Sequence, residues 1–161
     1  ATSPTYAQKL IGIIELYKLH EYDKAKKFDR FMERRSFKDD KSANGGLEHP
    51  IHIYNKNYYV IVRSGDTFKS LGRELGLSYK KIATFNERGK NDKLEKGEVI
   101  YLKKKQKKAE KQYKRRPHRV KAGESMYSIA QLYGIRLKSL YKMNGLTPDY
   151  SIKVGDKLRV R

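Results

Sequence analysis

One stretch of this chain occurs twice, and the two copies align without a gap. The first copy begins near Val62 and the second near Val120. Identical residues stand at equivalent positions: Val62/Val120, Gly65/Gly123, Ser70/Ser128, Gly76/Gly134, Lys80/Lys138, Asn86/Asn144 and Gly97/Gly155. Such an internal repeat predicts two copies of one small structural unit. Each unit is short enough that it can bury only a small core.

The chain of 161 residues has a net charge of +20 and no cysteine. The positive charge is concentrated in residues 103–117, KKKQKKAEKQYKRRP, between the two repeats. Self-repulsion predicts that this connector is a solvated spacer, and its charge would attract polyanions. Composition does not rank nucleic acid, anionic wall polymers and lipid phosphates as partners. Because no disulfide is possible, packing alone must stabilise each of the two units.

The first 46 residues favour helices. Pro4 opens a segment, 4–18, in which apolar residues recur at helical spacing. Residues 20–46 are rich in charge and predict a broken helix followed by a loose loop. No apolar run in the chain approaches the length of a membrane span.

A β-hairpin is predicted next. Residues 51–54 and 58–62 are β-branched and aromatic, as is typical of strands. Asn55, Lys56 and Asn57 lie between them, and asparagine tolerates left-handed turn geometry. The hairpin leads directly into the first repeat.

Each repeat is predicted to contain two helices between two strands. In the first repeat, apolar spacing indicates helices over 67–75 and 78–85, ended by Gly76 and Asn86, before a closing strand at 99–102. The second repeat has helices near 125–133 and 137–143 and strands near 118–121 and 157–160. The predicted fold class is α+β, with two β-α-α-β units, each placing two helices on a two-stranded antiparallel sheet, after an N-terminal helical segment.

The first repeat contains the motif residues Ser64-Gly65-Asp66-Thr67-Phe68, Leu71, Gly76, Ile82, Phe85-Asn86, and Leu94 before Gly97-Glu98-Val99-Ile100. In these residues and their spacing it resembles the LysM carbohydrate-binding module. The second repeat is similar to the same module at the same spacing.

The resemblance implies binding of β-1,4-linked N-acetylglucosamine polymers, either peptidoglycan or chitin. In that family the ligand lies in a shallow groove between the loop after the first strand and the loop after the second helix. The implied glycan-binding residues are Gly65, Asp66, Thr67, Phe68, Asn86, Leu94, Gly123, Glu124, Ser125, Met126, Tyr127, Asn144, Gly145, Leu146, Thr147, Pro148 and Ile152. The first repeat departs from the family where charged residues 87–92 replace a usually short apolar sequence, so the second repeat is the expected better binder.

Several of these residues also have a structural interpretation. Gly65 and Gly123 suit turns with positive φ, and Thr67 and Ser125 suit helix caps. Asn86 and Asn144 can close a helix and hold a loop through their side chains. The sugar-contact interpretation is favoured for Leu146, Thr147, Met126 and Tyr127, and it depends on the family.

A second resemblance is carried by residues 1–25, through Ala1 to Glu15, Leu19 and Tyr22-Asp23. These residues resemble the closing helix of bacterial flagellar-type N-acetylglucosaminidases. The catalytic glutamate of that family would lie upstream, and Glu15 matches a surface position. We therefore expect no catalytic residue in this chain, although the parent protein would be a peptidoglycan β-N-acetylglucosaminidase.

We expect no metal site or cofactor. His20, His49, His52 and His118 are scattered and lack partners at ligand spacing. No phosphate-binding loop or nucleophile elbow is present.

The hypothesis from sequence is a cell-wall-targeting region of a peptidoglycan hydrolase, located in the bacterial envelope or secreted, and monomeric. Its parts are a helix of a truncated glucosaminidase-like domain (1–25), a charged helix or linker (26–50), a hairpin with the first LysM repeat (51–102), a basic linker (103–117) and the second repeat (118–161). The alternative is a protein that binds nucleic acid or another polyanion through 103–117, although no known nucleic-acid motif is present.

Overall fold

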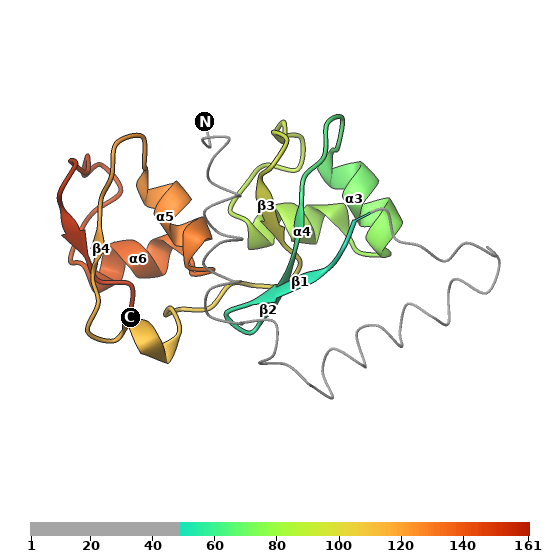
Figure 1. Cartoon of the computed structure of the whole chain (residues 1–161). Helices are drawn as coiled ribbons and strands as arrows, with labels where there is room; N and C mark the ends of the chain where they lie inside the picture. The colour runs from blue at the N-terminus through green and yellow to red at the C-terminus, as the bar shows by residue number, and fades with distance from the viewer. Residues whose placement is uncertain (1–48) are drawn as a thin grey trace.

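The computed structural model describes residues 49–161 (Figure 1). The helix predicted at 4–18 and the broken helix at 20–46 lie outside the described residues. No helix among residues 49–161 is long and apolar enough to cross a membrane.

The first repeat has the two predicted helices, on a three-stranded antiparallel sheet where the sequence predicts two strands preceded by a hairpin. The elements are β1 (His52–Tyr54), β2 (Asn57–Ile61), α3 (Phe68–Leu75), α4 (Tyr79–Phe85) and β3 (Val99–Tyr101). The strand order is β1-β2-β3, so the predicted hairpin adds a third strand to the edge of the repeat's own pair. The hairpin turns at Asn55 and Lys56, whose φ angles are 44° and 58°. Two successive positive φ angles are typical of the turn that matches strand twist in a two-residue hairpin loop.

The second repeat has the same order of elements on a smaller sheet. The elements are β4 (His118–Arg119), α5 (Met126–Leu132), α6 (Leu137–Met143) and β5 (Lys157–Leu158). Strands β4 and β5 pair antiparallel, and this completes the predicted α+β fold.

The first helix of each repeat begins with the same cap. The hydroxyl of Thr67 accepts a hydrogen bond from the backbone N–H of Ser70, and Ser70 bonds back to Thr67. Ser125 and Ser128 form the identical capping box in the second repeat. Each box satisfies backbone donors that the first helical turn leaves free, which explains why Ser70 and Ser128 are identical between the copies.

Strand β2 is buried on both faces. Tyr58, Val60 and Val62 pack with the repeat's own helices in one apolar cluster. Tyr59, from the other face, belongs to a second cluster that includes Ile129 and other core residues of the second repeat. Because alternate residues of a strand point to opposite faces, β2 connects the two repeats through one continuous layer of packing.

The basic connector differs from the solvated spacer that its composition predicts. Lys105 is 1% exposed and Ala109 is 0% exposed, and a short 3₁₀ helix, η2 (Lys111–Tyr113), buries Tyr113. Gln106 forms a bridge with Ile135 of the second repeat. The connector therefore packs between the repeats, because its few apolar groups and one buried ammonium contact residues there. The charge pattern of the sequence does not indicate these contacts.

Candidate functional site

The loops predicted to form the two grooves lie along one edge of the molecule. In Figure 1 the β2–α3 loop, the α4–β3 loop, the β4–α5 loop and the α6–β5 loop all lie at the upper edge of the view. The loops of both predicted grooves, one in each repeat, therefore lie at the same edge of the molecule.

The β2–α3 turn, one wall of the groove predicted in the first repeat, is fixed on one histidine. Asp66 accepts a hydrogen bond from the backbone N–H of Arg63 and lies 2.8 Å, Oδ2 to Nε2, from buried His49. The other ring nitrogen of His49 lies 2.7 Å from Glu74 on α3. Gly65 and Thr67 are exposed at the tip of this turn. The turn is thus held rigidly while its backbone faces solvent.

Two predicted contact residues of the first groove have side chains inside the core. Phe68 is 1% exposed and Asn86 is 0% exposed. The Asn86 amide donates to the carbonyls of Ile82 and Tyr101, each at 2.8 Å, and its oxygen accepts from the N–H of Tyr101 at 2.8 Å. Asn86 therefore ties the end of α4 to β3, as the structural interpretation predicts. Leu94 is half-buried against the same core.

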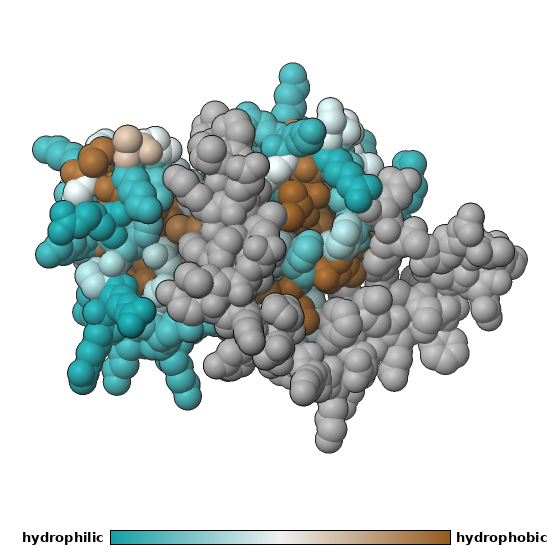
Figure 2. Space-filling model, in the orientation of Figure 1, coloured by the Kyte–Doolittle hydropathy of each residue, from teal (hydrophilic) through white to brown (hydrophobic). Residues whose placement is uncertain are grey.

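The groove of the second repeat exposes more of its predicted residues. Thr147 and Pro148 are exposed, and Leu146 and Ile152 are half-buried against the core. Gly145 has a φ of 63°, which suits glycine in this turn. Apolar surface gathers at the upper end of the second repeat in Figure 2. Val154, in the α6–β5 loop, is 71% exposed.

The opposite wall of the second groove repeats the histidine arrangement and contains buried groups. Glu124 accepts from the N–H of Lys121 and lies 2.7 Å, Oε2 to Nε2, from His118. Gly123 and Ser125 are exposed, whereas Met126 is 5% exposed. Asn144 bonds to Leu140 and Arg159 in the way that Asn86 bonds in the first repeat.

Tyr127 extends toward the first repeat. Its hydroxyl donates to the carbonyl of Asn86 at 3.0 Å, and the Nζ of Lys105 lies 5.7 Å from the centre of its ring. Burial raises the pKa of Tyr127 to about 12, although Arg88 opposes the shift. The phenol is therefore neutral and acts as a hydrogen-bond donor at neutral pH.

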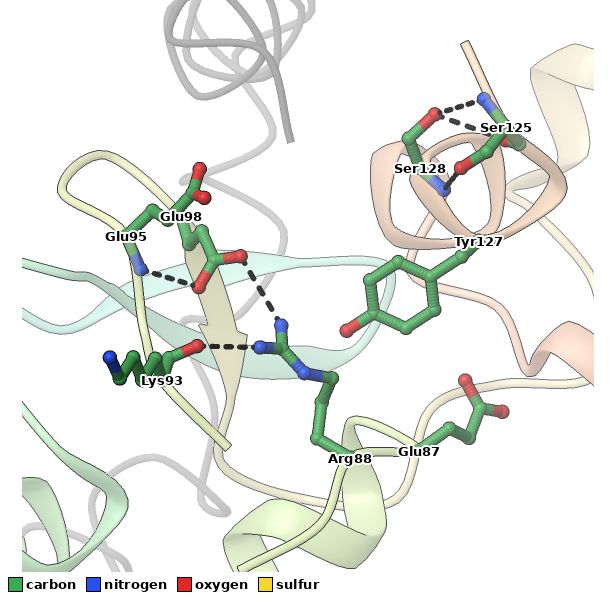
Figure 3. A pocket seen from close by; sticks show the side chains of 8 residues that line it. All are labelled: Glu87, Arg88, Lys93, Glu95, Glu98, Ser125, Tyr127 and Ser128. Carbon is green, nitrogen blue, oxygen red and sulfur yellow. Dashed lines mark hydrogen bonds and ion pairs between the residues drawn. The ribbon is translucent and has the colours of Figure 1, made fainter. Parts of the chain in front are cut away.

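A cleft of about 250 Å³ separates the two repeats at this point. It is lined by Glu87, Arg88, Lys93, Glu95, Glu98, Ser125, Tyr127 and Ser128. Figure 3 shows the ring of Tyr127 projecting from one wall toward Arg88 on the other. The α4–β3 loop of the first repeat supplies one wall, and the first turn of α5 supplies the other.

Comparison with known proteins identifies the repeats. The model of the LysM domain matches residues 60–103 and 118–161, which together are more than half of the chain. The chain belongs to the LysM domain family.

Its relatives are longer proteins. The chain is 42% identical over 41 residues to an uncharacterized lipoprotein, YgeR, of Escherichia coli, covering 26% of this chain and 16% of that one. It is 28% identical over 104 residues to an autolysin of Enterococcus faecalis, covering 62% and 14% respectively. The crystal structure of the spore cortex-lytic enzyme SleL of Bacillus cereus is 30% identical, with a TM-score of 0.27, and the match covers 64% of this chain and 22% of that one. The chain thus spans less than a quarter of the length of each of these proteins.

Arg88 is the central cation of the cleft between the LysM domains. Its guanidinium donates to Glu98 at 3.2 Å, to Asp92 at 3.2 Å and to the carbonyl of Lys93 at 2.7 Å. Burial works against its charge, but contacts with Tyr127 and Glu98 outweigh burial and raise the pKa of Arg88. The guanidinium is thus fixed in position, and its charge is largely balanced by carboxylates.

Lys105 fixes the two LysM domains together below the cleft. Its side chain is 0% exposed, and its Nζ lies 2.6 Å from Glu87 of the first domain and 2.6 Å from the side-chain oxygen of Gln131 in the second. Burial lowers the pKa of Lys105, and Glu87 partly opposes this. Glu87 also accepts from the N–H of Leu137 at 2.8 Å. One carboxylate and one ammonium thereby join connector, first domain and second domain.

Most of the cleft was missed by the sequence analysis, which placed only Ser125 and Tyr127 among its site residues. The signal that could have located it is the charged stretch 87–92, where the first repeat departs from the family pattern. Such a departure indicates a different neighbour, and here that neighbour is the second domain. Residues 49–161 contain no group of three histidine, aspartate or glutamate side chains placed to hold a metal ion.

Proposed function

We propose that this chain binds N-acetylglucosamine-containing glycan, peptidoglycan or a chitin-type polymer, as the wall-targeting region of a peptidoglycan hydrolase. The observation that carries the proposal is the presence of two LysM domains whose groove loops open on one edge. The similarity to an autolysin supports the hydrolase context.

The second groove suits an acetamido sugar chemically. Its α6–β5 loop combines exposed backbone around Gly145 with the half-buried side chains of Leu146 and Ile152. An acetamido group has one donor, one acceptor and a methyl, so backbone amides beside a small apolar surface can satisfy all three. We take the second groove as the stronger binder and the first as the weaker.

The context of the chain belongs to the same proposal. Residues 1–25 would end a glucosaminidase domain that supplies the catalytic carboxylates, and the LysM pair would hold that enzyme on its polymer. We propose a location in the bacterial cell envelope or outside the cell, and a monomer.

A polyanion-binding role is the second candidate. The connector exposes Lys103, Lys104, Lys107 and Lys108 although its backbone is packed between the domains. Ordered surface cations attract nucleic acid and anionic wall polymers through a term that salt screens, with a Debye length of about 10 Å at 0.1 M.

One pair of variants separates the two candidates. Replacing Leu146 and Thr147 by Asp places charge in the proposed sugar surface and should abolish the chitopentaose-induced shifts of the second repeat in an NMR titration. Replacing the four exposed connector lysines by Ser, with buried Lys105 unchanged, should leave that titration intact and weaken salt-sensitive binding to DNA or whole cell wall. If the connector variant loses the oligosaccharide and the loop variant keeps it, the proposed groove is wrong.

A further inference from the structure

The cleft between the LysM domains lies between the two proposed grooves. Its first wall, the α4–β3 loop, is also a wall of the first groove, and its second wall begins at Ser125, which belongs to the second groove. In Figure 1 these loops follow one another along the same edge. Groove, cleft and groove thus form a row.

We propose that the cleft is a third glycan contact, so that one long N-acetylglucosamine strand lies across both LysM domains. This inference rests on the proposed function, and it adds the length of strand that the chain recognises and the residues that contact its middle sugars.

The geometry of the cleft is fixed before a ligand arrives. Below it, buried Lys105 joins Glu87 to Gln131, and the hydroxyl of Tyr101 donates to the carbonyl of Gln131 at 2.8 Å. Gln131 in turn donates to the carbonyl of Val99 at 3.1 Å. Since the domains are joined through a shared core and these bonds, their grooves keep one spacing, and a strand that fits this spacing loses little free energy to reorganisation of the protein.

The chemistry of the cleft suits an uncharged, hydroxyl-rich ligand. Its lining carries Glu87, Glu95 and Glu98 against Arg88 and Lys93, in a chain whose net charge is +20. A polyanion would meet more carboxylates than cations here. Carboxylates accept and guanidinium donates hydrogen bonds, so both roles of a sugar hydroxyl can be matched.

Tyr127 gives the cleft an aromatic surface. The ring is half-buried and projects between the walls (Figure 3). A ring with an apolar face and a polar edge contacts the C–H face of a sugar while its rim bonds to the hydroxyls. Ser125 and Ser128 lie beside it on the same wall.

The test compares a short and a long chito-oligosaccharide by calorimetry on the full chain. The tetramer should bind weakly, through single grooves. One octamer should bind per protein chain, at least tenfold more tightly than the tetramer. Once the first part of the strand is bound, its second contact forms within the same complex and needs no second association step.

Two substitutions of Tyr127 assign this gain to the cleft. Tyr127→Ala should reduce octamer affinity about tenfold, equivalent to about 1.4 kcal/mol, and thereby lower the ratio of octamer affinity to tetramer affinity. Tyr127→Phe keeps the ring but loses the bond to Asn86, so it should keep the octamer gain. Glu95→Ala, on the exposed rim, should weaken the octamer alone, with Lys96→Ala outside the lining as its matched control.

The outcomes separate the inference from the proposed function. If neither oligomer binds, the proposed function is wrong. If both bind but the octamer has no advantage, or keeps it in Tyr127→Ala, the proposed function stands and the cleft inference is overturned.

Discussion

Replacing Lys105 tests whether the two LysM domains are one folding unit. The ammonium is completely buried and bonds Glu87 and Gln131, each at 2.6 Å. Lys105→Ala leaves Gln131 without this donor inside the protein and opens a cavity. Glu87 is 29% exposed and keeps its bond from Leu137, so its loss is smaller. Breaking a buried pair costs about 3–5 kcal/mol, and solvent near Glu87 reduces our expectation to about 2–3 kcal/mol.

Lys105→Met is the matched control, because it refills the volume without the charge. It should cost less than half as much as Lys105→Ala, since both variants lose the buried ammonium and its burial cost but only the alanine leaves a cavity. The assay is urea unfolding followed by circular dichroism, with a single transition expected for the wild type because both repeats contribute to one core. Two separate wild-type transitions, or an Ala variant within about 0.5 kcal/mol of wild type, which is the usual range of surface substitutions, would refute the reasoning.

The same control gives a dependence on pH. Because the folded pKa of Lys105 is lowered, the unfolded chain binds more protons between that pKa and the ordinary lysine pKa of 10.5. Stability should therefore rise with pH across this window, and the rise should be absent in Lys105→Met. The measurement is the urea midpoint of both proteins as a function of pH. It is made below pH 10, the usual tyrosine pKa, so that tyrosine ionisation does not contribute.

Three further predictions follow from the geometry. Asn86→Ala should lower the free energy of unfolding by about 2–3 kcal/mol and Asn144→Ala by about 1 kcal/mol, because Asn86 is 0% exposed and Asn144 is half-buried. Equal losses in urea unfolding would contradict this. Gly134→Ala should destabilise the protein more than Gly76→Ala, by about 1 kcal/mol or more. Both glycines have positive φ, but a Cβ at Gly134 would lie 3.1 Å from the Tyr101 hydroxyl, whereas one at Gly76 would have no neighbour within 4 Å. Thermal melts of the two variants give the ranking. Burial raises the pKa of Tyr54 and Tyr101, and that of Tyr127 to about 12. These phenols therefore favour folding below pH 10, and this contribution to stability is lost as pH rises through their folded pKa values. A pH titration followed by phenolate absorbance should show a late phase coincident with unfolding, and its absence would mean that these rings are accessible.

The sequence by itself determined the elements and the family. Two copies of one pattern predict two α+β units, because helix caps such as Thr67 and Ser125 and the glycine after α3 act within a few residues of chain. The hairpin around Asn55 was predicted for the same reason. Local signals are readable because both partners of each interaction lie close together in sequence.

Only the tertiary structure decided how the units meet. The run Tyr58 to Val62 is apolar on both faces, and the sequence does not say that its second face covers the other repeat. In the sequence, Lys105 cannot be distinguished from the exposed lysines beside it. It is buried because Glu87 and Gln131, from distant parts of the chain, bind its ammonium. Tyr127 lies at a predicted groove position, but its direction is set by Asn86 of the first repeat. The sequence pattern indicates whether a side chain is suited to burial or to hydrogen bonding. Which residue it contacts is determined by tertiary packing, because the two partners lie far apart in the sequence.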